Sequence, residues 1–245
     1  MNFCYTVGNI QTRLVKSKEE LKKALALRYH ELILDYNPNN TNPVEIDYDP
    51  IDDVCDHLIA INLDTNEVIG TYRLICKKHT DKFITESEYD LHKLKKYNLL
   101  EISRAVVKKE YRDGVVIRLL WKSIINYAKA CGADYMIGTA SFHGIDPVPF
   151  AEAFTYLYYN HLSPEEILCK SYEPNYSLQM LDAKDFNIVS AKHNLPPLIK
   201  GYLRLGCSIG DGVFIDKYFN SLDVLIVLEI KKISVRYLKR FLGCE

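Results

Sequence analysis

Hydrophobic and polar positions in the first third of the chain predict a strand, a helix and a hairpin. Residues 10–15 have the pattern of a strand, and residues 17–36 place leucine, isoleucine and tyrosine at helical spacing. Ser17 followed by Glu20 is typical of a capping box at a helix start. Residues 37–56 are rich in Asn, Asp and Pro, which predicts a long loop of the kind that is usually functional or mobile. Two apolar segments around the polar turn Asp-Thr-Asn then predict a hairpin.

The rest of the chain predicts alternating strands and helices. We expect strands at 99–107 and 133–142, helices at 115–131 and 147–162, and two or three strands within 200–230. Residues 163–200 predict irregular structure, and residues 231–245 predict a basic amphipathic C-terminal helix. This order of elements is typical of an α/β (α+β mixed) sheet covered by helices. Because no change of composition marks a boundary, we expect one domain over 1–245, with its core in 10–230.

Two charges stand inside the apolar strand 99–107. Regular alternation would place these residues on two faces: Glu101, Ser103 and Val107 on one, and Ile102, Arg104 and Val106 on the other. An unpaired buried charge is costly, so Glu101 and Arg104 must be paired or used in chemistry. A structural ion pair of Glu101 with Arg104, or with Arg73 of the hairpin, is one alternative, and it is compatible with a functional role.

The strand 99–107 leads directly into the helix 115–131 through a basic turn. A helix start presents free backbone N–H groups and a partial positive charge, which suit an anion. Gly114 removes a side chain at this point and Arg112 adds a full charge beside it. The turn therefore predicts a phosphate site. The alternative is an ordinary strand-to-helix turn with solvated charges.

Composition narrows the class of protein. The net charge of −1 does not indicate nucleic-acid binding. Seven scattered cysteines without a CxxC pair favour reduced thiols over a disulfide framework or a zinc site, and the histidines lack metal-binding spacing. We find no signal-peptide pattern, and the longest apolar run, 224–228, is far too short to span a bilayer. We therefore expect a cytoplasmic protein without a bound metal.

Five ordered segments carry a family resemblance. They are CDHLIAINLDTNEVIGTYRL, EISRAVV, YRDGVVIRLLW, GTASFHGIDP, and LPPLIKGYLRLGCSIGDG with the strand DVLIVL after it. Together they resemble the GNAT-fold, acyl-carrier-protein-dependent N-acyltransferases that make lyso-ornithine lipids and related N-acyl amino acids. The resemblance covers roughly residues 10–230. More distantly, the chain is similar to acyl-homoserine-lactone synthases, which share an arginine on the first helix (here Arg28), an acidic stretch before the hairpin, Arg73, and the Glu101-x-x-Arg104 pair.

The resemblance implies an N-acyltransferase that moves a long-chain acyl group, with a 3-hydroxy chain expected first. The acyl group would pass from an acyl-carrier-protein thioester, or from acyl-CoA, to the amine of a small acceptor such as ornithine or glycine. Acyl-phosphopantetheine would be a co-substrate, with no permanently bound cofactor. Glu101 is the first candidate for the base that takes the amine's proton, and His57 is the second. Arg104 and Arg73 would hold Glu101 ionised or bind the carboxylate of the acceptor.

The resemblance also assigns binding roles. Backbone N–H groups at Val106 and Val107 would polarise the thioester oxygen, and Arg112 and Gly114, with Ile117, would hold the pantetheine phosphate. The turn Arg112-Asp113-Gly114-Val115-Val116 lacks the second small residue of acetyl-CoA users, which favours one phosphate over a CoA pyrophosphate. The expected substrate-binding residues are Arg28, Asp47, Asp49, Asp56, Ser141 and Phe142. Asp53 is grouped with the other three aspartates, which together would attract a cationic acceptor such as ornithine. Core packing is the alternative for Ser141 and Phe142, and a solvated acidic loop is the alternative for the aspartates.

Basic residues late in the chain suggest partners. Lys200, Arg204 and Arg236 would dock an acidic acyl carrier protein. The tail 231–245 would rest on the inner face of an anionic membrane, or pack on the sheet with its basic face in water. Two other functions stay open: an autoinducer-type acyl-homoserine-lactone synthase, and a non-catalytic, haemolysin-like membrane-associating protein. Glu101, Arg104 and Arg112 at one strand–helix junction favour an enzyme.

Overall fold

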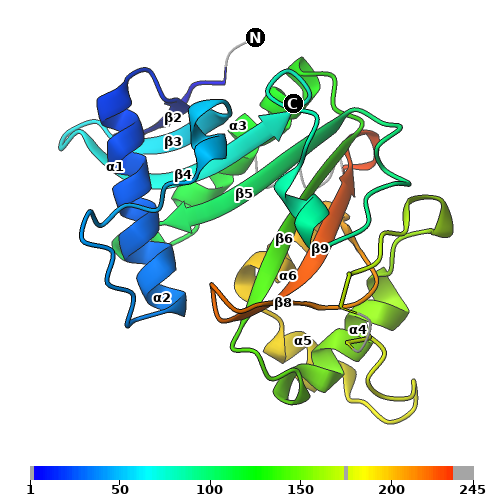
Figure 1. Cartoon of the computed structure of the whole chain (residues 1–245). Coiled ribbons are helices and arrows are strands. Elements are labelled where there is room, and N and C mark those ends of the chain that lie inside the picture. The colour runs from blue at the N-terminus through cyan, green and yellow to red at the C-terminus, as the bar shows by residue number, and fades with distance from the viewer. Residues whose placement is uncertain (1–2, 174–175, 234–245) are drawn as a thin grey trace. The chain divides into compact units, whose positions relative to one another are not determined.

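The computed structural model describes residues 3–173 and 176–233, which form two compact units (Figure 1). The first unit contains residues up to 81 and residues 100–133. The second contains residues 82–99 and the described residues from 134 onward. Among the described residues, no helix is both long enough and apolar enough to cross a membrane.

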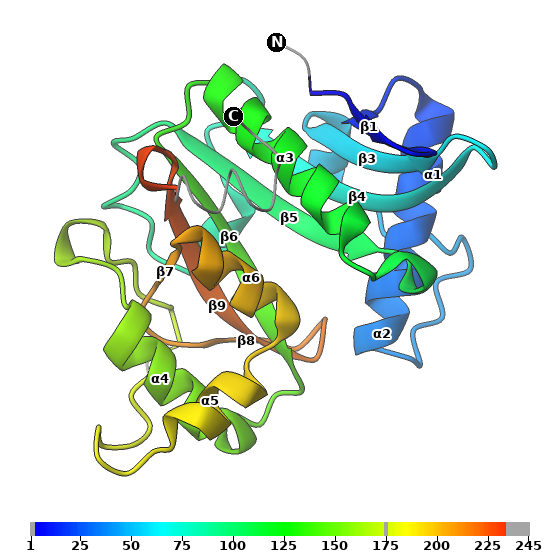
Figure 2. The ribbon, with the colours of Figure 1, turned by 180° about the vertical axis from the view of Figure 1, so that it is seen from behind.

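The first unit is an antiparallel sheet between two helices. Its strands pair in chain order: β1 (Tyr5–Val7), β2 (Ile10–Leu14), β3 (Asp56–Asn62), β4 (Glu67–Cys76) and β5 (Leu99–Val107). The helix α1 (Lys18–Arg28) covers one face, and α3 (Val115–Ala130) covers the other, as the front and back views show (Figure 1, Figure 2). The predicted strand 10–15, hairpin, strand 99–107 and helix 115–131 are confirmed.

The helix predicted for 17–36 forms with an irregular second half. Ser17 Oγ accepts the N–H of Glu20 at 3.2 Å, as a cap does. The Glu20 carboxylate accepts the N–H of Lys16, at 2.8 Å, and two bonds from Arg13. After α1 the helix widens into a π-helical turn (Tyr29–Ile33) and ends in α2 (Leu34–Tyr36). Such π turns are frequent near functional sites.

A β-bulge in β5 changes which side chains share a face. Thr71 pairs with Val106 and Arg73 with Ser103, so Arg104 and the residue after it both lie opposite a single residue of β4. Arg104 has a φ of 53°, in the left-handed region, which fits a bulged position. The extra residue brings Val106 onto the α1 face, where it packs in the core.

The predicted alternation of β5 is therefore wrong beyond Ser103. The Arg104 side chain also reaches the α1 face, where it bonds to Asp47. The bulge thus places Arg104 and Val106 on the face that carries Ser103, opposite to what a regular strand would do.

The second unit is built on a long antiparallel pair. The strands β6 (Tyr135–His143) and β9 (Ser221–Glu229) pair along their full length, and the short strands β7 (Ser208–Ile209) and β8 (Phe214–Asp216) also pair with β9. The helix α4 (Ala151–His161) confirms the helix predicted for 147–162 in its main part. The strands predicted within 200–230 are confirmed from residue 208 onward.

The expectation of irregular structure over 163–200 is wrong in its second half. The helices α5 (Ile188–Asn194) and α6 (Pro197–Leu205) lie there. Asn187 caps α5 through its side-chain oxygen, and Gly206, at a φ of 99°, ends α6. Of the predicted C-terminal helix 231–245, residues 234–245 lie outside the described residues.

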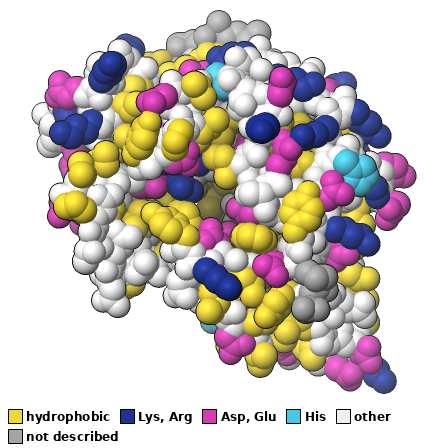
Figure 3. Space-filling model, in the orientation of Figure 1, with side chains coloured by type: hydrophobic (Ala, Val, Ile, Leu, Met, Phe, Trp, Pro, Cys, Tyr) yellow, Lys and Arg dark blue, Asp and Glu magenta, His cyan; other side chains and the backbone are white. Residues whose placement is uncertain are grey.

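Short 3-10 turns complete the structure. They are Pro50–Asp53, Ile84–Ser87, Lys109–Tyr111, Val148–Phe150, Glu165–Ile167 and Ile230–Lys232. The first of these lies in the predicted loop before β3, which we call the acidic loop (residues 37–55). Basic and acidic side chains are interspersed on the surface over α1 (Figure 3), in keeping with a net charge near zero.

Candidate active site

Polar side chains gather on the α1 face of the first unit's sheet, where β3, β4 and β5 run side by side. His57 on β3 pairs with Arg73 on β4, which in turn pairs with Ser103 on β5. Paired residues project from the same face of a sheet, so these three side chains form one row. Glu101 lies two residues before Ser103, on the same face, opposite Ile75. The sheet thus brings together three of the four residues predicted to be catalytic, and the bulge adds Arg104.

Arg28 connects α1 to the acidic loop through buried ion pairs. Its Nε donates to Asp47 Oδ2 at 2.7 Å, and its Nη1 and Nη2 donate to the two oxygens of Asp52 at 2.9 and 3.1 Å. Arg104 Nε donates to the same oxygen of Asp47 at 2.7 Å. Burial acts to raise the pKa values of both aspartates, but the guanidinium groups hold those pKa values below the usual range.

One nitrogen atom of Arg73 has no hydrogen-bond partner in the described part of the chain. Its Nε donates to Ser103 Oγ at 3.0 Å, and its Nη1 donates to Asp49 Oδ2 at 3.0 Å and Asp52 Oδ1 at 3.1 Å. Its Nη2 is buried and has no hydrogen-bond partner among the described residues. The side chain is only 1% exposed. A buried donor without a partner costs about 1–3 kcal/mol, so this atom suits an acceptor oxygen brought by a ligand.

His57 likewise presents one unused ring nitrogen. Its Nε2 lies 3.0 Å from the carbonyl oxygen of Asp52, which can only accept, so Nε2 carries the proton. Nδ1 is then a lone-pair acceptor, and it is buried with no partner in the described part of the chain. Burial lowers the pKa of His57, and Arg28 and Arg73 act in the same direction. The imidazole is therefore neutral at pH 7, as a general base must be.

The six charged residues that we call the arginine–aspartate network are Arg28, Arg73, Arg104, Asp47, Asp49 and Asp52. They balance three positive charges against three negative charges. Asp52, which bonds to two arginines and orients His57, was not singled out from the sequence. Its only signal was the run of acidic residues in the loop. Glu101 lies beside this network and is 1% exposed.

The predicted phosphate turn has the expected backbone and an unexpected acidic partner. Gly114, at a φ of 95°, immediately precedes α3, and Asp113 Oδ1 accepts the N–H of Val115 at 2.9 Å. Arg112 donates from Nε to the Val107 carbonyl at 2.8 Å and from Nη2 to Glu31 at 2.9 Å. Arg112 is about half exposed, with 46% of its side chain accessible. Glu31, from the π-helical turn, thus holds a guanidinium group that we expected to face a phosphate.

Comparison with known proteins identifies the family. The model of the acetyltransferase (GNAT) domain matches residues 27–122. The L-ornithine N(alpha)-acyltransferase of Brucella abortus is 32% identical, over 98% of this chain and 90% of that protein. The protein of the same name from Rhizobium meliloti is 33% identical, over 96% of this chain and 85% of that protein. This chain belongs to the L-ornithine Nα-acyltransferase family.

Solved structures agree with this family in fold. FeeM, an N-acyl amino acid synthase from uncultured soil microbes, has a TM-score of 0.50 at 10% identity, covering 91% of this chain and 92% of that one. BjaI, a CoA-dependent acyl-homoserine lactone synthase, has a TM-score of 0.55 at 14% identity, covering 93% and 83%. The predicted GNAT fold is confirmed, and the chain is an N-acyltransferase of the ornithine N-acyltransferase type.

Only some of the aspartates that were predicted to attract the acceptor amine belong to the arginine–aspartate network. Asp56 points to the opposite face of the sheet, because it precedes His57 by one residue, and it accepts bonds from Lys78 and Tyr127. Asp53, in the acidic loop, is exposed and accepts from Tyr48. Asp47 and Asp49 are bound by arginines, so their charges are already neutralised. A cationic acceptor would meet few free carboxylates among these four.

The remaining predicted binding residues are placed as follows. Val106 is buried in the core and Val107 is partly buried, as is Ile117 in the first turn of α3. In the second unit, Phe142 on β6 stacks edge-on with Phe154 at 4.7 Å, which is the core packing we gave as an alternative, and Ser141 pairs with Asp223. Lys200 donates to the His193 carbonyl and Arg204 is exposed. Arg236 lies outside the described residues.

One group at this site has donor atoms close enough for a metal ion. Asp52, Cys55 and His57 offer ligand atoms within 4.8 Å of one another. Both oxygens of Asp52 already accept guanidinium bonds, and burial raises the pKa of Cys55 to about 12, so the thiol stays protonated. A metal ligand must be deprotonated and available, so this group does not fit a cation.

Proposed function

We propose that this N-acyltransferase moves a long-chain fatty acyl group from a phosphopantetheine thioester to the α-amino group of a small amino acid. The first expectation for the acceptor is ornithine, because relatives at 32–33% identity are named L-ornithine N(alpha)-acyltransferase. The amine nitrogen attacks the thioester carbonyl, an amide bond forms, and the thiol leaves. The product is an N-acyl amino acid.

The observation that carries the proposal is a pair of buried nitrogen atoms, Nη2 of Arg73 and Nδ1 of His57, to which none of the described residues forms a hydrogen bond. They belong to residues that pair directly across two strands. Arg73 Nη2 is a charged donor and suits a carboxylate. His57 Nδ1 is a neutral acceptor and suits an N–H group. An α-amino acid carries a carboxylate and an amine on one carbon atom, so it supplies both partners at once.

The reaction needs a base because the acceptor amine is protonated at pH 7. Proton removal by a positioned side chain contributes about 10²- to 10⁴-fold in rate. His57 meets the requirements through its free Nδ1 and lowered pKa. Glu101 is the other candidate on this face. The geometry of His57 favours it over Glu101, which the sequence had placed first.

The proposed acyl donor is acyl carrier protein that carries a fatty acyl chain as a thioester. A 3-hydroxy chain is the first expectation. Support comes from the turn before α3, where Gly114 is followed by Val115 and Val116 rather than by a second small residue. Such a turn suits the single phosphate of a carrier-bound pantetheine. Arg204, exposed on α6, suits an acidic carrier surface. Because the N-acyl amino acid product is amphiphilic, we propose that the enzyme acts at the cytoplasmic face of a membrane.

Acceptor choice is the direct test. The purified protein is incubated with 3-hydroxyacyl carrier protein or the matching acyl-CoA, and with ornithine, lysine, glycine or putrescine, which is ornithine without its carboxylate. Thiol release and the mass of the amide product are measured. We expect ornithine to exceed putrescine by at least tenfold in kcat/KM. Equal use of putrescine would refute the carboxylate role of Arg73. A lactone product from S-adenosylmethionine, or no turnover with any acceptor, would favour the autoinducer or the non-catalytic alternative.

A further inference from the structure

The hydroxyl group of Ser103 has an unused proton in the row that this side chain forms with Arg73 and His57. Ser103 Oγ accepts the Nε–H of Arg73 at 3.0 Å, and this is the one hydrogen bond that the oxygen forms with the described residues. A serine hydroxyl can also donate once, so its proton has no acceptor within that part of the chain. The Ser103 side chain is partly exposed, so a ligand can supply the acceptor.

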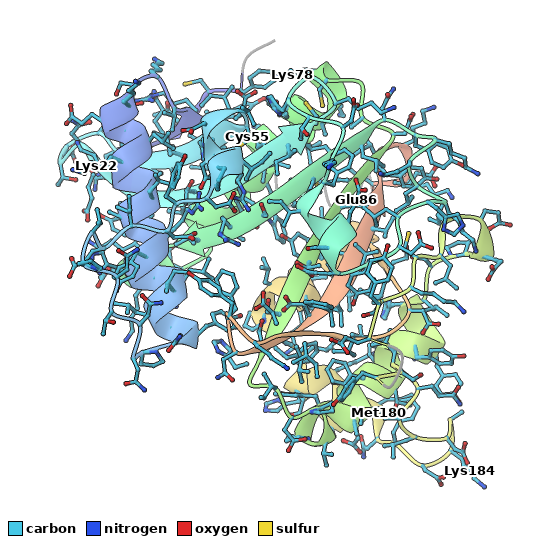
Figure 4. The ribbon with its side chains drawn as sticks, in the orientation of Figure 1. Lys22, Cys55, Lys78, Glu86, Met180 and Lys184 are labelled. Carbon is cyan, nitrogen blue, oxygen red and sulfur yellow. The ribbon has the colours of Figure 1, made fainter. Side chains whose placement is uncertain are left out.

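The nitrogen atoms of Arg73 have different surroundings. The acidic loop, which ends at Cys55 beside β3 (Figure 4), supplies Asp49 and Asp52, and both carboxylates accept from Nη1. A guanidinium group is planar, and its Nε–H and one Nη2–H point in nearly the same direction from one edge. Ser103 Oγ already accepts the Nε–H on this edge. An oxygen atom that accepts from Nη2 on the same edge would therefore stand beside Ser103 Oγ.

Two hydrogen-bond donors thus converge on one position. Oxygen atoms that accept from the two neighbouring nitrogen atoms of a guanidinium edge stand side by side, close to the separation of about 2.7–2.8 Å in an O–H···O hydrogen bond. The Ser103 proton and the Nη2–H of Arg73 can therefore reach the same oxygen atom. Nη2 is buried and has no hydrogen-bond partner among the described residues. A single ligand oxygen would give both donors an acceptor.

We propose that Ser103 is a further substrate-binding residue, which donates its hydroxyl proton to the carboxylate oxygen that Arg73 Nη2 also binds. This inference rests on the proposed function, because it takes an α-amino acid as the acceptor. An anionic oxygen suits the position, since one of the two donors carries a full positive charge and charge-assisted hydrogen bonds are the stronger ones. The carbonyl oxygen of an ester or a carboxamide is uncharged. The pair of donors therefore selects amino acids with a free α-carboxylate.

The pairing of three strands sets the direction in which the acceptor lies. Arg73 on β4 has His57 of β3 on one side and Ser103 of β5 on the other. A carboxylate that is bound by Arg73 and Ser103 lies toward β5. His57 Nδ1, the acceptor atom for the amine, lies toward β3. The α-carbon of the amino acid then lies over β4, with the amine held at the base.

Ser103 also positions Arg73, because its oxygen accepts the Nε–H. The two roles depend on different parts of the hydroxyl group. Positioning needs the oxygen lone pair and acts through the arginine at position 73. Substrate binding needs the proton and acts on the carboxylate directly. A variant without the hydroxyl group loses both, so the test must also examine Ser103 when residue 73 is no longer an arginine.

Acceptor preference in Ser103→Ala is the first measurement. The full-length protein is assayed with the acyl donor and with ornithine or putrescine, and kcat/KM is measured for each acceptor. We expect the preference for ornithine to fall about tenfold, mainly through the KM for ornithine. Putrescine has no carboxylate, so its kcat/KM should stay at the wild-type value, which also shows that the variant is folded.

Two further variants serve as controls. Ser103→Thr keeps the hydroxyl group and should keep the preference for ornithine. Ser87→Ala removes an exposed hydroxyl that donates to the Ile84 carbonyl at 2.7 Å, and it should change neither kcat/KM value. An unchanged preference in Ser103→Ala would overturn the proposal.

A double-mutant cycle separates substrate binding from positioning. Ser103→Ala is made in the wild-type protein and in Arg73→Lys, and the preference for ornithine over putrescine is measured in all four proteins. If Ser103 donates to the carboxylate itself, its loss should lower the preference by about threefold or more in the Arg73→Lys protein as well. No further fall in that background would show that Ser103 acts only through Arg73, and would overturn the proposal.

Failure of the proposed function would give a different result. Equal use of ornithine and putrescine by the wild-type protein would remove the carboxylate from recognition and overturn both proposals. If the wild-type protein prefers ornithine and Ser103→Ala keeps that preference, only the role of Ser103 is wrong.

Discussion

His57 lies directly opposite Arg73 in the pairing of β3 with β4, and each presents one buried nitrogen atom that no described residue binds. Native proteins rarely leave buried polar atoms unsatisfied, and exceptions are concentrated where a ligand or a reaction completes the bonding. The remaining nitrogen atoms of both side chains are fixed by the acidic loop and by Ser103. The two free atoms are therefore held in place before a substrate arrives, which reduces the cost of binding.

Arg73→Lys tests the carboxylate role. Lysine keeps the positive charge but loses the forked donors, so we expect the KM for ornithine to rise about 10- to 100-fold, as for a lost hydrogen bond to a charged group of about 1.5–3 kcal/mol. The KM for the acyl donor should stay unchanged. Arg13→Lys is the matched control, because Arg13 bonds to Glu20 outside the network. An equal rise of both KM values would argue for general damage to the fold.

The pH profile tests the base. Because the pKa of His57 is lowered, the imidazole stays neutral at more acidic pH than an ordinary histidine does. As the pH is lowered from 7, kcat/KM should therefore stay constant past pH 6.5 and decrease only at lower pH. His57→Gln should lower kcat about 10²- to 10⁴-fold and remove that fall. His92→Gln, at an exposed histidine, is the control. If Glu101 is the base, the fall would persist in His57→Gln and disappear in Glu101→Gln.

Much of this fold could be predicted from local pattern, because the elements that formed as expected have strong signals of their own. Six of the nine residues in the strand 99–107 are apolar, and the helix 115–131 repeats apolar residues at helical spacing. The helices α5 and α6 were missed because both are short and lie close together among prolines. In such segments tertiary packing decides the structure, and propensity alone does not.

The candidate site was predictable in its residue types but not in its pairings. The charges of Arg73 and Arg104 marked the region because an apolar strand cannot leave them unpaired. The partner of each depended on how the acidic loop folds back, so Asp52 was overlooked among several acidic neighbours. The bulge at Arg104 depends on the register of β4 with β5, a long-range property with no glycine to signal it.

Asp52→Asn tests whether the arginine–aspartate network stabilises the fold. Removing this carboxylate leaves Arg28 and Arg73 buried with one charge too many, which should cost about 3–5 kcal/mol in the free energy of unfolding. Asp53→Asn changes an exposed neighbour and should cost less than about 1 kcal/mol. Denaturant unfolding measures both.

The pH dependence of unfolding gives an independent check of the same carboxylate. The folded-state pKa of Asp52 lies below its unfolded value, so its contribution is complete above about pH 4 and is lost as pH falls through the folded value. Wild-type protein should therefore lose more stability on acidification than Asp52→Asn does. Parallel curves for the two proteins would show that the network does not act through this charge.

Arg112→Ala tests the phosphate turn, and the outcome depends on how Glu31 shares the guanidinium group. Arg112 donates to Glu31 through Nη2 alone, and about half of the side chain is exposed, so a phosphate can approach it from solvent. We expect the KM for the acyl donor to rise about 10- to 30-fold, which corresponds to about 1.5–2 kcal/mol, the lower part of the range for a hydrogen bond to a charged group. Glu31→Gln should lower that KM, because the competing carboxylate charge is gone. Lys129→Ala, in the last turn of α3, is the matched control. An unchanged donor KM in both Arg112→Ala and Glu31→Gln would assign Arg112 a purely structural role between α3 and the π-helical turn.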